Sequence, residues 1–384
     1  MVESNYDSVI AFIRSLYPRN AETIPLHAPI FLGNEKRYVA DCLDSSFVSS
    51  IGPYVTQLET MMCERTGAAY AVATNSGTAA LHAALLSAGV ESGDEVLTQP
   101  ISFVATANAI AYCNAVPVFI DVELTTMGLC PEHLERFLHS RTYIKSGVCY
   151  NRKSGRKIAA CVPMHTFGHP VSIQQIIVIC ESYHIPVIED AAEALGSYSH
   201  NKHCGTFGLA GIFSFNGNKI VTSGGGGMIV TDNSGFAEHA RHLTTTAKKP
   251  HPYAYEHTQV GYNYRMPNIN AALCCGQLEQ LDIFLAKKRW IAEAYKAFFE
   301  ESSLAFVKEP DNARSNYWLN SIMTQGQRER DCLLEQSCAA KIMTRPVWAP
   351  LNRLPMFKHC ETYGTEHTDY LAQRIVNLPS SVAL

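Results

Sequence analysis

The sequence predicts an α/β protein whose large domain contains a seven-stranded, mostly parallel mixed sheet flanked by helices, followed by a smaller C-terminal α/β domain. Short apolar runs rich in β-forming residues recur between residues 70 and 231, and helical patterns such as 78–88 and 173–183 separate several of them. This alternation is typical of a parallel sheet covered on both faces. The strand-like runs are 70–74, 95–98, 117–120, 158–162, 186–189, 211–215 and 227–231.

Other sequence features predict the remaining elements and the domain boundaries. A short glycine-rich stretch joins the last two runs and has no room for a helical crossover, so one strand is expected to be antiparallel. After Pro267 the pattern changes to two helices, 269–281 and 285–299, and then to less regular α/β. An amphipathic segment, 6–16, lies near the start. The expected division is an N-terminal arm at 1–22, a large domain at 23–255 and a small domain at 256–384.

Composition narrows the class of function. The 384 residues are 47% hydrophobic and 17% charged, which suffices for two folded domains. A formal net charge of -4 without long Lys and Arg runs disfavours nucleic acid or an anionic membrane as a partner and favours a small molecule. No apolar stretch approaches about 18 residues and the N-terminus is acidic, so a cytoplasmic protein is expected. The 13 cysteines form no CxxC pair and are expected to be reduced.

The most informative segment surrounds Lys219. A strand-like run delivers Ser214, a turn follows, and four consecutive glycines, 224–227, come shortly after the lysine. A lysine nucleophile needs its amine held in a fixed, partly desolvated place, and glycines let the backbone approach a bulky ligand. A solvated loop lysine is the alternative interpretation.

A second strand end carries acids. The run 186–189 ends in Glu189 and leads to Asp190. A carboxylate at a buried strand end must be paired, and the protonated ring nitrogen of pyridoxal 5′-phosphate (PLP) offers such a pairing. A metal ligand or a helix N-cap fits Asp190 taken alone. Asp190 and Lys219 together, on neighbouring strand ends, favour PLP.

A third strand runs through Asn75 to Thr78 directly into a helix rich in Ala and Leu. The N-terminus of a helix, with free amides, hydroxyls and a glycine, is a seat for phosphate. An N-cap serine at the start of any helix would look similar. Phe103 lies just past the next strand, where its ring would stack on a pyridine or belong to the core.

These segments resemble the motifs of one known family. SGTAAL, SFVATANAI, EDAAEALGS, GTFG, SFNGNK with the glycine run, and GYNYRMPNINAAL are similar to those of the DegT/DnrJ/EryC1/StrS sugar aminotransferases, which are fold-type-I PLP enzymes. The match covers about residues 25–300 and implies that fold. PMHTFGHPV, HLTTTAKKPHPY and VNLPSSV resemble the branch that acts in legionaminic acid and bacillosamine synthesis.

The resemblance implies roles for the cofactor-binding residues. Lys219 would hold PLP covalently as a Schiff base, Asp190 would face the pyridine nitrogen, and Phe103 would stack on the ring. The phosphate would be held by Ser76, Gly77, Thr78 and Ser214.

Other positions receive roles in the same way. Glu193 stands where many relatives have a Gln that bonds the 3′-oxygen of PLP, so the acid must share a proton or bond differently. Asn263 would reach the phosphate from the partner subunit of a homodimer, with Tyr264 and Arg265 as buttresses. His165, at a strand end, would line the substrate pocket or act as a hydrogen-bonded structural histidine.

The predicted reaction is a two-stage transamination. Glutamate or a similar donor gives an amino group to the cofactor, which passes it to the C4 ketone of a UDP- or GDP-linked 4-keto-6-deoxy N-acetylhexosamine, and Lys219 moves the proton. One alternative is a sugar dehydratase of the same fold, in whose branch His replaces the lysine. The other is a catalytically silent protein that binds PLP or a nucleotide sugar. No metal is expected, since His251 and His257 lack metal-ligand spacing.

Overall fold

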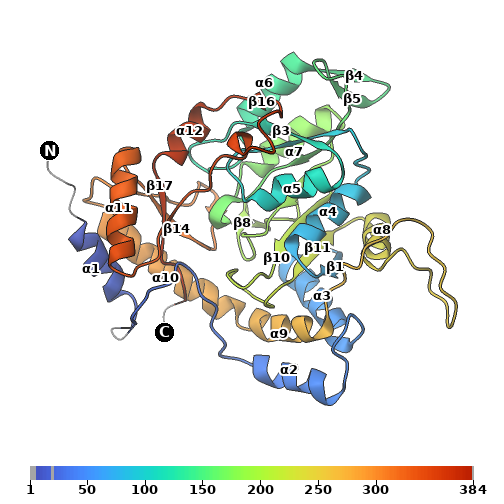
Figure 1. Cartoon of the computed structure of the whole chain (residues 1–384), viewed down its shortest axis with the longest axis horizontal. Helices are drawn as coiled ribbons and strands as arrows, with labels where there is room; N and C mark the ends of the chain where they lie inside the picture. The colour runs from blue at the N-terminus through green and yellow to red at the C-terminus, as the bar shows by residue number, and fades with distance from the viewer. Residues whose placement is uncertain (1–5, 19–20, 383–384) are drawn as a thin grey trace.

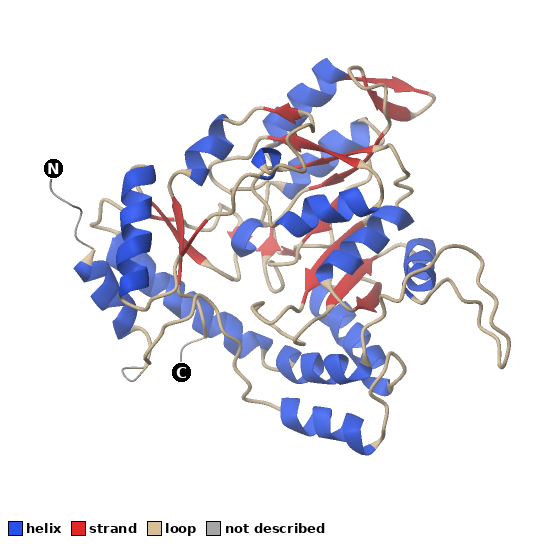
Figure 2. Cartoon of the chain, in the orientation of Figure 1, coloured by secondary structure: helices blue, strands red, loops and turns tan. Residues whose placement is uncertain are grey.

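The computed structural model of the chain describes residues 6–18 and 21–382, and Figure 1 shows its elements in order. A central sheet lies between layers of helices, and a smaller antiparallel sheet lies beside it among the C-terminal helices (Figure 2). No helix in the described part of the chain is long and apolar enough to cross a membrane.

The central sheet contains the seven predicted strands and one more. Two four-stranded ladders, β1-β11-β10-β7 and β6-β2-β3-β16, meet through parallel bridges from Cys161 to Val187 and from Met164 to Asp190. The strands are β1 (Tyr70–Thr74), β2 (Glu95–Thr98), β3 (Val116–Ile120), β6 (Ile158–Val162), β7 (Ile188–Asp190), β10 (Ala210–Ser214), β11 (Gly227–Thr231) and β16 (Thr362–Tyr363).

The expected antiparallel strand is β11, which pairs antiparallel with both β1 and β10. The pairs β2 with β3, β2 with β6, and β7 with β10 are all parallel. The prediction of a mostly parallel mixed sheet is therefore confirmed. The eighth strand, β16, was not expected and comes from the C-terminal part of the chain, where it pairs in parallel with β3.

Helices cover both faces because successive strand residues point to opposite sides. On one face, Val72 and Ile229 pack with apolar residues of α4, α5 and α8. On the other face, Ala73 and Met228 pack with α3 and α9, and β2 and β3 pack with α6 and α7. The helices are α2 (Glu35–Asp44), α3 (Pro53–Thr66), α4 (Gly77–Ser87), α5 (Val104–Tyr112), α6 (Pro131–Arg141), α7 (Ile173–Ser182), α8 (Ser234–Thr244) and α9 (Asn268–Leu278).

A second core surrounds the smaller sheet, whose order is β12-β14-β17-β15 and whose pairings are all antiparallel. The amphipathic helix α1 packs its buried Val9 and Ile13 into this core. The elements here are α1 (Asp7–Ser15), α10 (Leu281–Phe299), β12 (Ala305–Phe306), β14 (Asn320–Met323), α11 (Gln327–Ala339), β15 (Arg345–Pro346), α12 (Glu366–Ala372) and β17 (Ile375–Leu378).

Short elements complete the chain. A hairpin extends from the central sheet, a three-stranded sheet pairs segments far apart in sequence, and two single turns are 3-10 helices. These elements are β4 (Thr142–Lys145), β5 (Val148–Asn151), β8 (Tyr198–Ser199), β9 (Lys202–His203), β13 (Ala313–Arg314), η1 (Thr166–Gly168) and η2 (Leu351–Arg353).

One close contact joins the loop after β6 to the C-terminal part of the chain. Gly168 has a φ of +93°, and a Cβ added there would lie 1.9 Å from Oδ1 of Asn316. The Gly168 carbonyl also accepts hydrogen bonds from the hydroxyls of Ser197 and Ser315. Glycine is therefore required at position 168 both for its left-handed backbone and for the space that Asn316 occupies.

We expect Gly168→Ala to destabilise the protein more than Gly67→Ala. Gly67 ends α3 with a φ of +81°, but no atom lies within 4 Å of an added Cβ, so this control carries only the left-handed cost of about 1–2 kcal/mol. Gly168→Ala adds a steric clash of about 2 kcal/mol or more. Urea unfolding of both variants measures the difference. Equal costs would show that the contact between Gly168 and Asn316 contributes nothing.

Candidate active site

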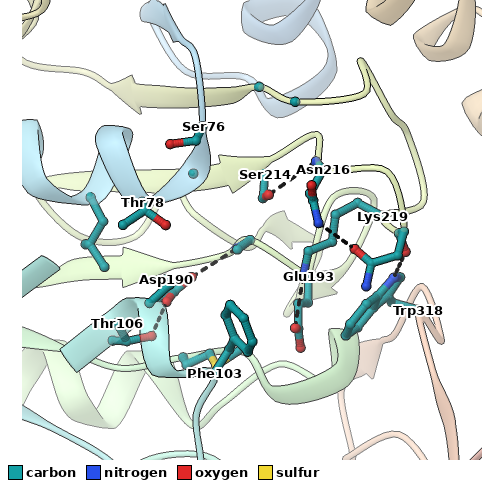
Figure 3. Close-up of a pocket in the computed structure, with 18 of the residues that line it drawn as sticks. Ser76, Thr78, Phe103, Thr106, Asp190, Glu193, Ser214, Asn216, Lys219 and Trp318 are labelled. Carbon is teal, nitrogen blue, oxygen red and sulfur yellow. Dashed lines mark hydrogen bonds and ion pairs between the residues drawn. The ribbon is translucent and has the colours of Figure 1, made fainter. Parts of the chain in front are cut away.

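A cavity of about 340 Å³ opens at the carboxyl ends of the central strands (Figure 3). It lies at the sheet edge where open α/β sheets bind their ligands. Eight residues that the sequence predicted for one site line this single cavity. They are Ser76, Gly77, Thr78, Phe103, Asp190, Glu193, Ser214 and Lys219.

Strand pairing explains this convergence. Because β7 and β10 are parallel, with Asp190 level with Ile212, both strands end at the same edge of the sheet. Ser214 is the last residue of β10, and the turn that follows leads to Lys219. Strand β11 returns between β10 and β1, so Gly227 lies opposite both Thr74 and Ser214. The residues after β1 and after β10 therefore meet.

Asp190 is a buried carboxylate with few partners. Only 5% of the residue is exposed, and its oxygens accept hydrogen bonds from the Thr106 hydroxyl at 2.7 Å and from the Ala192 N–H at 3.2 Å. Burial raises its pKa, although both hydrogen bonds and the charge of Lys219 oppose this shift. Among the described residues it forms no ion pair. The carboxylate can therefore accept a further hydrogen bond from a cationic ligand in the cavity.

Its neighbour Glu189 points to the other side of the strand. The Glu189 oxygens accept hydrogen bonds from the N–H groups of Gly205, Phe207 and Gly208 and from the His165 ring. Three of these donors belong to the GTFG segment. Glu189 thus fixes the loop before β10, and only Asp190 of the two acids faces the cavity.

Lys219 lies between an acid and an aromatic ring. Its Nζ is 3.0 Å from Oε1 of Glu193 and 4.0 Å from the centre of the Trp318 ring, and 12% of its side chain is exposed. The second oxygen of Glu193 accepts the Phe167 N–H at 2.9 Å. Burial raises the pKa of Glu193 to about 6, against the opposing effects of Lys219 and the Phe167 N–H.

The start of α4 forms an anion seat. Ser76 is the N-cap, and its Oγ accepts the Ala79 N–H at 3.1 Å. The first N–H groups of a helix have no partner within the helix and attract anions. A Cβ added to Gly77 would lie 2.9 Å from Cβ of Ser214, so glycine lets the Ser214 hydroxyl approach the start of α4. The N–H groups at the start of α4 and the Ser214 hydroxyl are suited to hold a phosphate.

Phe103 precedes α5 and is 50% exposed although it lines the cavity. Its ring is 6.3 Å from that of Trp348, centre to centre. A half-exposed ring beside a cavity is suited to stacking on a flat ligand. Four features of the cavity together fit PLP: the unpaired Asp190 carboxylate, the anion seat at α4, the free face of the Phe103 ring and the Lys219 amine.

Two predicted residues do not line the cavity. His165 is fully buried, its Nε2 is 3.0 Å from Glu189, and its Nδ1 accepts the Val171 N–H at 3.1 Å. This geometry agrees with a hydrogen-bonded structural histidine. Asn263 is exposed and its carbonyl accepts a hydrogen bond from the Asn75 side chain at 3.3 Å. Its contribution to a partner's site stays a prediction.

Sequence reasoning missed several lining residues, of which Trp318 and Trp348 are the largest. Trp318 lies in the stretch 302–341, where no motif was found, and Trp348 lies just beyond it. The chain contains three tryptophans, so the rarity of this residue was the available signal. Smaller residues missed in the same way include Thr106, Met164, Asn216 and Asn218.

Comparisons with known proteins agree with this arrangement. A model of the DegT/DnrJ/EryC1/StrS aminotransferase family matches residues 31–384. The GDP-perosamine synthase of Escherichia coli O157:H7 is 38% identical over 362 residues, covering 94% of both chains. The GDP-perosamine synthase of Vibrio cholerae is 34% identical over 364 residues, covering 93% of this chain and 94% of that one.

Solved structures show the same fold. Aminotransferase TlmJ from Streptoalloteichus hindustanus superposes with a TM-score of 0.84 at 26% identity, covering 93% of both chains. A DegT DnrJ EryC1 StrS aminotransferase from Brucella abortus superposes with a TM-score of 0.82 at 25% identity, covering 99% of this chain and 94% of that one.

We expect the stability of the PLP-free protein to depend on pH through Glu193. Its pKa rises from 4.5 to about 6 on folding, so its stabilising contribution is complete below pH 4.5 and is lost as pH rises through about 6. Relative to Glu193→Gln, the wild-type free energy of unfolding should decrease by about 2 kcal/mol over that range. Denaturant titrations at several pH values measure this difference. The substitution Glu238→Gln at an exposed position serves as the control. A difference in unfolding free energy between the wild type and Glu193→Gln that does not change with pH would contradict the assignment.

Proposed function

The chain belongs to the DegT/DnrJ/EryC1/StrS aminotransferase family, and from this premise we propose that it transfers an amino group from glutamate to the C4 ketone of a nucleotide-linked sugar. It is a PLP-dependent aminotransferase. The observation that carries the proposal is the convergence of the Lys219 amine and the buried Asp190 carboxylate on one cavity. The proposed acceptor is a UDP- or GDP-linked 4-keto-6-deoxy N-acetylhexosamine, used in surface glycans of the bacillosamine or legionaminic acid type.

The residues of the cavity divide the chemistry among them. Bound PLP supplies an electron sink for negative charge on the carbon next to the transferred nitrogen. Asp190 would accept a hydrogen bond from the protonated pyridine nitrogen, and the start of α4 with Ser214 would hold the phosphate. Phe103 would cover one face of the ring. Lys219 would bind the cofactor covalently and, once released, move the proton between carbon atoms.

The charge balance of the cavity supports a partner subunit. Its lining contains one cationic side chain, Lys219, and two carboxylates, Asp190 and Glu193. Glutamate and nucleotide-linked sugars are anions, so additional positive or hydrogen-bonding groups must come from elsewhere. The segment after α8 projects away from the rest of the chain (Figure 1), and its Tyr253 and Tyr255 are 85% and 81% exposed. We place this segment against the second copy of a homodimer.

The acceptor assignment is tested with a panel of nucleotide-linked 4-keto sugars and glutamate. The wild type should convert a member of the panel to an amino sugar, detected by mass, and should carry PLP that borohydride fixes to Lys219. Lys219→Ala should lose both properties, because Lys219 provides the one amine among the described residues that line the cavity. The exposed Lys202→Ala is the matched control and should retain both.

Two results would contradict this assignment. Bound PLP that glutamate never converts to its amine form would favour the silent binding protein. Conversion by glutamate without an amino product from any sugar would remove the sugar acceptor and leave the aminotransferase.

Shared active sites predict complementation between inactive chains. Asn263→Ala should weaken the partner's hold on the phosphate and, like Lys219→Ala, reduce activity strongly. When the two variants are unfolded, mixed and refolded together, each hybrid dimer has one intact site, so about a quarter of wild-type activity should return. The same two variants refolded separately and assayed together are the control and should stay inactive. No recovery in hybrids that have been isolated as dimers would show that Asn263 does not act across the interface.

A further inference from the structure

The Lys219 amine occupies a defined position away from the Asp190 side of the cavity. It contacts the Glu193 carboxylate at 3.0 Å and the face of the Trp318 ring at 4.0 Å (Figure 3). We propose that Glu193 and Trp318 form a seat for the Lys219 ammonium group, which the amine occupies when it is neither bonded to the cofactor nor acting as the base of the proposed reaction. The inference rests on the proposed function and assigns Trp318 as a positioning residue for the lysine.

Trp318 is held rigidly in place. Its N–H donates to Oδ1 of Asn316 at 2.7 Å, and its indole N–H donates to the Asn218 carbonyl at 2.7 Å. Its carbonyl accepts a hydrogen bond from the fully buried Lys288 at 3.0 Å. These three hydrogen bonds come from separate segments, so the ring face is fixed before the amine arrives. A fixed aromatic face attracts an ammonium group without the cost of ordering the ring.

Asn316, which accepts the Trp318 N–H, also holds Glu193 on the other side of the seat. Asn316 is fully buried, and its Nδ2 donates to the carbonyls of Glu193 and Leu195 at 2.8 and 2.9 Å. Glu193 is also anchored through the Phe167 N–H, which leaves its Oε1 directed at Lys219. Asn316 therefore ties the backbone of Glu193 to the backbone of Trp318.

The seat has a chemical use in the donor half-reaction. In the proposed reaction, the donor nitrogen would replace Nζ of Lys219 on the cofactor carbon to which Nζ is bonded. With the linkage to the cofactor protonated before and after the exchange, the three protons of the donor's ammonium group would end on Nζ. Lys219 would then leave as a cation and would give up one proton before acting as the base. Glu193 and Trp318 both favour a cation, and with 12% of the lysine side chain exposed, water screens their attraction only in part. The seat thus favours release and delays recapture.

The PLP-free chain provides the first test. Lys219 in the seat should react slowly with an amine-reactive reagent such as trinitrobenzenesulfonate, followed by mass of the peptide that contains it. Trp318→Leu and Glu193→Gln should each raise the labelling rate about three- to thirtyfold, and Trp318→Phe, which keeps a ring face, should raise it less. The exposed Trp290→Leu on α10 is the matched control and should label like the wild type.

The PLP-bound protein provides the second test, in which the variants are expected to react more slowly than the wild type. With saturating glutamate, loss of the visible absorbance of covalently bound PLP should be about three- to thirtyfold slower in Trp318→Leu and Glu193→Gln. The KM for glutamate should change less than about twofold, since the seat does not contact the donor. Wider access to the lysine would speed both reactions, so faster labelling with slower release identifies the seat.

The outcomes separate this inference from the proposed function. PLP that never attaches to Lys219 in the wild type would remove the proposed function. PLP that attaches normally, with labelling and release unchanged in Glu193→Gln and Trp318→Leu, would overturn the seat alone. Faster labelling together with faster release would also overturn it. Glu193→Gln decides the question if Trp318→Leu fails to fold.

Discussion

The parallel pairing of β7 with β10 is the constraint on which the rest of the site depends. Asp190 lies level with Ile212 in that register, so the acid and the turn that carries Lys219 leave the sheet at the same edge. A shift of one residue would exchange Glu189 and Asp190 between the two faces. Glu189 would then lose the N–H groups of the GTFG segment that satisfy it, and a buried unpaired carboxylate is costly. The register and the site therefore support each other.

The sheet was predictable because its strands carry local signals. Four of the seven predicted runs coincide with β1, β2, β6 and β11, and the other three differ by one or two residues at their ends. The glycine-rich connection correctly indicated that β11 is antiparallel. Strand β16 gave no such signal, because a two-residue strand has no measurable period and its partner β3 lies far away in the sequence.

The cofactor side of the cavity was predictable for the same reason, since its residues stand at strand ends and at a helix start. For Trp318 and Trp348 the sequence offered only the rarity of tryptophan. Trp318 is placed at the cavity by hydrogen bonds with Asn218 and Lys288, which are 100 and 30 residues away in the sequence. The ambiguity at His165 has a related cause. The end of a strand predicts the position of the His165 backbone but not the direction of its ring. The hydrogen bonds of the ring with Glu189 and with the Val171 N–H show that both ring nitrogens have partners inside the protein.

The two walls of the cavity come from separate parts of the chain. The candidate cofactor ligands lie between Ser76 and Lys219, whereas Trp318 and Trp348 come from the C-terminal part. The strand register that places Asp190 involves neither tryptophan. Trp318 differs from Trp348, because Asn316 ties it to Glu193 and its ring touches Lys219. Within this one aromatic wall, Trp348 packs on the rings of Phe103 and Phe167, whereas Trp318 contacts the lysine amine itself.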